Sequence, residues 1–249
     1  MNRIRFDLLQ IVTGGEGFHW VDFDRLPLRH GDVLHLGSGQ AHAFDRDSTH
    51  EALLVVFLPE AIPGDLLRLA GWGRSGVVHL PGEETEVLVS IAELMLEVQK
   101  RKLEAGNETQ RFLLAAVLGL VREAARRDEP TSRPARTSVA FDELVDRHFA
   151  DPLGLEWYAA QLGISTRTLS RICLKSRGVT PKQHLDRRRG LEAKRLLLDA
   201  ERTVRQVGVV LGFEETTNFV KFFRRVVGQT PTEFRRAVGI GARAGSRAP

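Results

Sequence analysis

Two short groups of basic and polar side chains in the C-terminal half have the chemistry needed to contact a duplex nucleic acid. The first lies in STRTLSRICLKSR, from position 165, and the second in GFEETTNFVKFFRR, from position 212. Arginine can donate two hydrogen bonds to guanine, asparagine can pair with adenine, and a threonine methyl can touch the thymine methyl. We expect base contacts from the exposed members of both groups: Arg167, Ser170, Arg171, Thr216, Thr217, Asn218 and Lys221.

Neighbouring basic side chains are better suited to phosphates, which position a protein without reading sequence. We assign this role to Lys175, Arg177, Arg224 and Arg225. Charge supports a polyanionic partner for this half only. Residues 141–249 hold 20 Lys and Arg against 12 Asp and Glu, whereas residues 1–140 hold 16 against 20. A single basic helix is usually no more than a solvated surface, so the assignment depends on the elements that carry these residues.

Both groups lie in a pattern that predicts a helix-turn-helix, in residues 155–181 and again in 204–231. In the first copy Ala159 lets two helices approach, Gly163 makes the turn, and Ser165 is placed to cap the second helix. Gly208 and Gly212 take the corresponding places in the second copy, 49 residues downstream of the first turn glycine. Two copies in register favour a DNA reader over a generic basic helix.

Each copy closes with the same G-x-T-P signal, at residues 178–181 and 228–231. The glycine can end one helix, and the Thr-Pro pair can cap and start the next. A helix over about 181–200 is expected to join the copies. Gly190 inside it costs about 1 kcal/mol relative to alanine.

Residues 141–238 resemble the DNA-binding domain of the AraC/XylS family of bacterial transcription regulators. The matching residues are Ala159 to Gly163, Leu169-Ser170-Arg171, Gly178 to Pro181, Arg189, Ala193, Leu196-Leu197, Leu211-Gly212-Phe213, Asn218-Phe219, Phe222, Gly228 to Pro231 and Phe234-Arg235. Cys173 stands where the family usually has Phe, and Gly208 where it usually has Ala. The resemblance implies double-stranded promoter or operator DNA as the partner, with RNA polymerase as a further plausible one.

The N-terminal half has a different character. Four segments rich in β-branched and aromatic residues, IRFDLLQIV, FHWVDFD, DVLHL and EALLVVFL, predict short strands of a small barrel or sandwich. Turns are expected at residues 14–15, 26–32 and 37–40. Two amphipathic helices follow, over 84–103 with Val87, Ile91, Leu94 and Val98 on one face, and over 108–126 with Phe112, Leu113, Ala116 and Leu120.

This half more weakly resembles a cupin-like sensor domain, through residues 28–32 and 39–44. The resemblance implies a small-molecule effector site, for which we select His19, Trp20, His35 and His42, and a helical dimerisation region that would make the protein a homodimer. Packing of both helices onto the barrel is an equal alternative. Catalytic cupins carry a His-x-His pair that is not present here, so no metal and no cofactor are expected.

The predicted fold class is α+β, with a cupin-like barrel and two helices before an all-α double helix-turn-helix domain. The expected boundaries are 1–127 for the effector-binding and dimerisation domain, 128–138 for the linker, 139–240 for the DNA-binding domain and 241–249 for a flexible tail. The predicted function is an effector-responsive transcription regulator, expected to be a cytoplasmic activator. We expect no catalytic residues and no membrane segment.

Two other classes are open on the sequence alone. A metal-dependent cupin enzyme carrying a DNA-binding module would need bound metal. A DNA-repair methyltransferase fusion would need a nucleophilic cysteine. The chain has only Cys173, inside the second helix of the first predicted helix-turn-helix.

Overall fold

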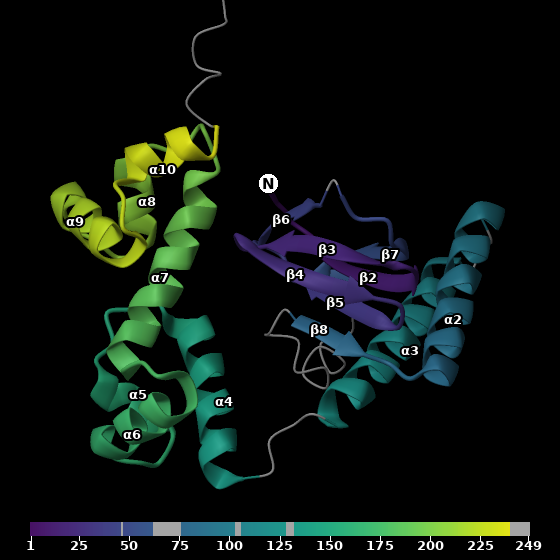
Figure 1. Cartoon of the computed structure of the whole chain (residues 1–249), viewed down its shortest axis with the longest axis horizontal. Helices are drawn as coiled ribbons and strands as arrows, with labels where there is room; N and C mark the ends of the chain where they lie inside the picture. Colours follow the sequence, from purple (N-terminus) through teal and green to yellow (C-terminus); the bar gives the residue numbers. More distant parts are fainter. Residues whose placement is uncertain (46, 62–75, 103–105, 128–131, 240–249) are drawn as a thin grey trace, which may run out of the picture. The chain divides into compact units, whose positions relative to one another are not determined.

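The computed structural model describes residues 1–45, 47–61, 76–102, 106–127 and 132–239. The chain divides into two compact units, Met1–Glu129 and Pro130–Pro249. In the described residues, the first unit consists of strands, a short 3-10 helix and two α-helices, and the second consists of helices, so the fold is α+β (Figure 1).

The described part of the first unit forms two antiparallel sheets of four strands each. One has the order β1 (Asn2–Arg3), β6 (Ala41–Phe44), β3 (Glu16–Val21) and β4 (Asp24–Arg29); the other has β7 (Glu51–Phe57), β2 (Asp7–Gly14), β5 (Asp32–Leu36) and β8 (Gly76–His79). Within the described ranges no strand pairing joins the two sheets. The strands expected from the sequence are present as β2, β3, β5 and β7, but closure into a cupin-like barrel is not confirmed.

The prediction of a turn at residues 26–32 is wrong for the first four residues, because they belong to β4. Pro27 pairs in register with Phe18 of β3. A proline has no backbone N–H to donate to a neighbouring strand, so a segment that contains one is not expected to form a strand. β4 tolerates it because this strand lies at the edge of its sheet.

Successive side chains of β2 point to opposite faces of its sheet, so the core of the first unit has two layers. Leu8 and Val12 face the space between the sheets, where they pack with Leu34 and Leu36 of β5. Leu9 and Ile11 face the other way, toward helices α2 (Gly82–Arg101) and α3 (Gly106–Arg127). Figure 1 shows these two helices together on one face of the second sheet.

The apolar faces expected on the two helices are only partly right. On α2, Val98 is buried in the core, whereas Val87 and Leu94 are 52% and 50% exposed, so the expected seam is divided between two faces. On α3 the core takes a neighbouring stripe, Leu114, Val117, Leu118, Val121 and Ala124, and leaves Phe112 69% exposed. The α3 sequence offers two apolar stripes, and periodicity alone cannot say which one meets the sheet.

The second unit is helical throughout its described part. Its helices are α4 (Arg133–His148), α5 (Leu155–Gln161), α6 (Thr166–Arg177), α7 (Pro181–Leu197), α8 (Val204–Val210), α9 (Thr216–Val227) and α10 (Pro231–Ala237). The long helix α7 runs from the group formed by α4, α5 and α6 to the group formed by α8, α9 and α10 (Figure 1).

The predicted linker of residues 128–138 is too long at its C-terminal end. Helix α4 already begins at Arg133, with the Ser132 hydroxyl accepting from the Ala135 amide. Pro134 lies in the first turn, where a helix tolerates proline because no intrahelical donor is lost. Positions 128–131, and the expected tail at 241–249, lie outside the described residues.

Candidate nucleic-acid interface

The first helix-turn-helix consists of α5 and α6. Ala159 is buried where the two helices meet, and Gly163 makes the turn with a φ of 63°. The Ser165 hydroxyl accepts from the amide of Thr168 at 3.2 Å, which confirms the expected N-cap of α6. Leu169 and Cys173 are fully buried on the inner face of α6.

The second helix-turn-helix consists of α8 and α9. Gly212 makes its turn with a φ of 80°, and a Cβ added there would lie 2.9 Å from the Ala150 carbonyl oxygen. Gly208 replaces the alanine of the first copy because Phe219 lies so close that a Cβ would be 3.2 Å from the Phe219 Cβ. Unlike Ser165, Glu215 at the start of α9 makes no side-chain cap hydrogen bond.

Both G-x-T-P signals perform the expected local role. Gly178 and Gly228 end α6 and α9 with φ values of 68° and 87°, in the left-handed region that favours glycine. Thr180 and Thr230 then begin α7 and α10 with reciprocal capping boxes. The ends of the reading helices are therefore set by local sequence.

On α6, Arg167, Arg171 and Lys175 are exposed and Ser170 is half-buried. These four line one surface hollow together with Thr168 and Leu174. The structure thus brings the predicted residues of the first group together on one edge.

On α9 the predicted residues Thr216, Thr217, Asn218 and Lys221 are exposed. The opposite face buries Phe219, Phe222 and Phe223 in the unit's interior. Phe213 of the turn packs against the rings of Phe219 and Phe222. The aromatic side chains therefore fix the helix, and the polar side chains are left to face solvent.

The side chains assigned to phosphate have different environments. Lys175 and Arg224 are exposed. Arg225 lies 3.0 Å from the Asp186 carboxylate of α7, although its side chain is 60% exposed. Arg177 is not at the exposed edge: its guanidinium contacts Ser138 and Asp142 of α4.

Sequence reasoning gave no role to two arginines that secure the ends of supporting helices. Arg189 of α7 donates to the carbonyl oxygens of Phe149 and Asp151, which follow α4. Arg235 of α10 donates to the carbonyl oxygens of Leu197, Asp199 and Arg202, at and beyond the end of α7. Carbonyls at helix ends have no intrahelical partner, so each arginine satisfies them and fixes the loop that leads to a helix-turn-helix.

The single cysteine has a structural environment. Cys173 is fully buried between α6 and its neighbours, and burial raises the pKa of its thiol. The reactive species of a cysteine is the thiolate, so this environment suppresses nucleophilicity. A methyltransferase centred on Cys173 has no support here.

In the first unit, the selected effector residues do not form one group. The His19 and His42 rings stack with centroids 5.3 Å apart, and His19 Nε2 lies 3.0 Å from His42 Nδ1. Trp20, next to His19 on β3, faces the other side and donates to Asp45. His35 lies two residues after Val33 on β5, so both side chains point to the same face of the sheet. That face is covered by the helices and does not face His19.

Two residues that were not selected as effector residues belong with the histidine pair. Gln10 of β2 is buried, and its Nε2 lies 2.5 Å from His50 Nε2. Within the described part of the chain, Gln10 Oε1, His19 Nδ1 and His50 Nδ1 are buried without a hydrogen-bond partner. Burial, with the charges of His42 and His50, lowers the pKa of His19 to about 4, so its ring is neutral near pH 7. Burial also lowers the pKa of His42.

These groups do not form a metal site by geometry. Among the residues that the structure describes, no three His, Cys, Asp or Glu side chains are placed to hold a metal ion. In the same residues, no helix is long and apolar enough to cross a membrane.

Solved structures that align with the chain include that of ToxT from Vibrio cholerae O395. It aligns with 94% of this chain and 89% of its own, at 12% identity and a TM-score of 0.45. A probable AraC family transcriptional regulator from Rhodopseudomonas palustris aligns with 41% of this chain and 96% of its own, at 26% identity and a TM-score of 0.37.

Two helix-turn-helix motifs that share one connecting helix, each with a polar exposed edge, are typical of a DNA-binding protein. Residues 158–237 match the family model described as a helix-turn-helix domain, and the HTH-type transcriptional activator RhaS of Escherichia coli O139:H28 is 25% identical over 93% of this chain and 85% of its own. The chain is a DNA-binding transcription regulator that resembles the AraC/XylS family.

Proposed function

We propose that α6 and α9 enter successive major grooves on one side of an operator duplex. The observation that carries this proposal is the division of each helix into a buried apolar face and an exposed polar edge. Recognition helices on one side of B-DNA are spaced by about 34 Å, one helical turn. The shared helix α7 gives one chain a framework for two such contacts.

Within this proposal Arg167, Arg171 and Asn218 read base edges, and Ser170, Thr216, Thr217 and Lys221 contact either bases or the backbone. Lys175 and Arg224 neutralise phosphates. Arg225 contributes less to phosphate binding because Asp186 already neutralises part of its charge.

The test begins with selection of binding sites from random DNA, followed by affinity measurements at several salt concentrations. Arg171→Ala should weaken binding to the selected site by about 1–3 kcal/mol and relax preference at one base position. Lys175→Ala, on the same edge, is the matched control, and it should weaken all sequences alike. An Arg171→Ala variant with unchanged preference would refute the reading role, and absence of salt-dependent binding by the wild type would refute the function itself.

For the first unit we propose a cupin-like sensor that binds a small effector between its sheets, beside His19, His42, Gln10 and His50. Three buried polar atoms without protein partners support this place, because such groups usually bind water or a ligand. Isothermal titration of candidate metabolites, with His19→Ala as the comparison, tests it. A metabolite bound equally by both proteins would exclude this location.

A homodimer is proposed through the exposed stripe of α2 that contains Val87 and Leu94. Val87→Glu with Leu94→Glu should shift sedimentation to the monomer, and a dimer that survives both changes would contradict this surface. Activation through contact with RNA polymerase, in the cytoplasm, completes the proposal. In vitro transcription from a selected operator, with and without the effector, determines the sign of regulation.

A further inference from the structure

Arg177 ends the first reading helix, yet its side chain is directed into the unit and is only 19% exposed. Its Nη2 lies 2.5 Å from Asp142 Oδ2 and donates to the Ser138 carbonyl oxygen at 3.0 Å. Its Nη1 contacts the hydroxyl oxygens of Ser138 and Ser176. The planar guanidinium therefore has both of its terminal nitrogens engaged, mainly with α4.

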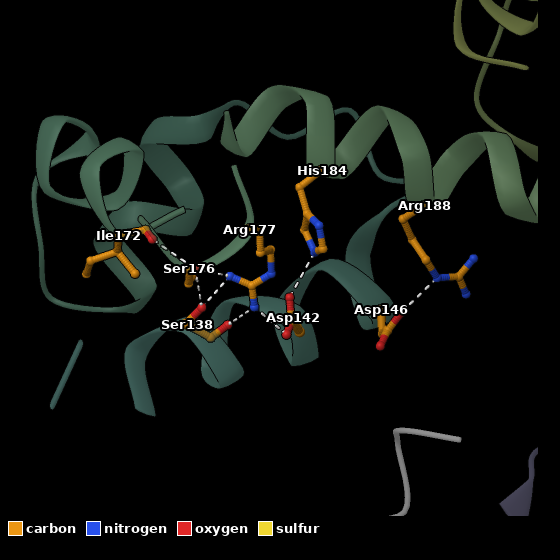
Figure 2. A network of polar contacts seen from close by, with 8 residues as sticks. All are labelled: Ser138, Asp142, Asp146, Ile172, Ser176, Arg177, His184 and Arg188. Atoms are coloured by element: carbon orange, nitrogen blue, oxygen red, sulfur yellow. Dashed lines mark hydrogen bonds and ion pairs between the residues drawn. The ribbon is translucent and has the colours of Figure 1, made fainter. Parts of the chain in front are cut away.

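Asp142 connects three helices. It accepts from Arg177 of α6, and its other carboxylate oxygen lies 2.9 Å from His184 Nε2 of α7. Figure 2 shows Ser138, Asp142 and Asp146 along one face of α4, directed toward α6 and α7. Asp146 extends the row by pairing with Arg188 of α7 at 2.7 Å.

The second helix-turn-helix has a simpler version of the same contact. Asp186, on the helix that precedes α8 and α9, pairs with Arg225 in the last turn of α9. In both helix-turn-helix motifs a buried aspartate of the preceding helix pairs with an arginine near the end of the second helix of the motif. Arg177 has several acceptors and little exposure, whereas Arg225 pairs with the single carboxylate of Asp186 and remains 60% exposed.

We propose that Arg177 is a positioning residue for operator binding, which acts by fixing the last turn of α6 to Asp142 of α4. This inference rests on the proposed reading role of α6. Charge-assisted bonds to a buried carboxylate hold a helix end more firmly than contacts to solvent. The small displacements that this contact prevents would misplace Arg167 and Arg171 relative to the groove.

A pair of variants distinguishes positioning from direct contact with a phosphate. Asp142→Asn removes a negative charge close to the DNA-binding helix, so a phosphate-binding Arg177 would bind operator equally well or more tightly. Positioning predicts the opposite sign, a loss of about tenfold, comparable to one base contact. Arg177→Lys keeps the charge but loses the planar fork, so positioning predicts a similar loss and a phosphate contact predicts little change.

The second measurement is the affinity of the full chain for its selected operator as a function of salt concentration. A loss of stability alone would not change the slope of this dependence. Removal of one phosphate contact lowers the slope of log affinity against log salt by about 0.9. We expect this reduction for Lys175→Ala, the control on α6, and an unchanged slope for Arg177→Lys and Asp142→Asn. Circular dichroism confirms that each variant is folded at the temperature of the assay.

If Asp142→Asn does not fold, Ser138→Ala takes its place, because it removes one acceptor of Arg177 and leaves the carboxylate. A several-fold loss of affinity with an unchanged slope supports positioning. Wild-type affinity in both Ser138→Ala and Arg177→Lys overturns it, while leaving the reading function intact. A wild-type protein that binds no DNA overturns the proposed function, and positioning with it.

Discussion

Gly190 lies in the middle of α7 and is buried against α9. A Cβ added there would be 2.7 Å from Val226 Cγ1 and 3.6 Å from Val227 Cγ2. Glycine inside a helix is less favourable than alanine by about 1 kcal/mol. The structure gives the reason for this cost, since the missing side chain lets α7, which joins the two helix-turn-helix motifs, approach α9.

The magnitude for Gly190→Ala follows from two opposing effects. Helix propensity favours alanine by about 0.8–1.0 kcal/mol, and overpacking a well-filled site costs about 1–3 kcal/mol. A contact of 2.7 Å with a short branched side chain leaves little room for adjustment. We expect the second unit to lose about 1 kcal/mol of unfolding free energy.

The same substitution should have the opposite sign in a Val226→Ala background. Shortening Val226 removes Cγ1, and the nearest remaining atoms are about as far away as ordinary van der Waals contact. Only the propensity gain then remains. Gly190→Ala should therefore stabilise the Val226→Ala protein by about 0.8–1.0 kcal/mol.

Urea unfolding followed by Trp157 fluorescence measures both differences. Trp157 lies on α5 and packs against His148 and Tyr158, so it reports on the second unit. The other two tryptophans are changed to phenylalanine in all four proteins. A Gly190→Ala effect of the same sign in both backgrounds would refute the packing explanation, and an unchanged denaturant slope is needed for the comparison to hold.

The remaining predictions concern helix ends and pH. Arg235→Ala should destabilise the second unit by about 2 kcal/mol, since three carbonyl oxygens lose a charged donor, whereas the adjacent and exposed Arg236→Ala should change little in the same urea titration. Ser165→Ala should cost about 1 kcal/mol and Glu215→Ser should add about 0.5–1 kcal/mol, because only the first of these positions now caps its helix. The pKa of His19 is about 4 in the folded chain and 6.5 in the free side chain, so the unfolded chain takes up a proton first as the pH falls. The free energy of unfolding should therefore be unaffected by His19 above pH 6.5 and should fall by about 3 kcal/mol as the pH drops toward 4. Thermal unfolding followed by Trp20 from pH 7 to 4.5 should show this decline in the wild type and a weaker one in His19→Gln.

The helix-turn-helix elements could be predicted from the sequence because each boundary has a local cause. Gly178 and Thr180 determine the junction of α6 and α7 through left-handed φ and a capping box, and neither depends on distant contacts. The inward and outward faces of α9 also follow from the spacing of its phenylalanines. Local signals of this kind are readable without a structure.

The first unit was harder to predict because tertiary contacts determine its strands and buried faces. Pro27 made an edge strand look like a turn in the sequence, and α3 has two apolar stripes of which only one packs on the sheet. The polar cluster joins Gln10 of one sheet to His50, and the stacked His19 and His42 belong to the other sheet. No spacing in the sequence brings these residues together.

Arg177 and Lys175 show why residue type could not assign roles on the reading helix. The two are separated by two positions at the end of α6 and carry the same charge. Two positions on a helix are about 200° apart around the axis, so Lys175 faces solvent while Arg177 faces α4. The deciding feature is the carboxylate of Asp142, some 35 residues earlier, which offers Arg177 a buried partner. An arginine beside a recognition edge is therefore less available to a phosphate when a buried carboxylate lies within its reach, as for Arg177 and, in part, for Arg225, and that condition is a property of the fold.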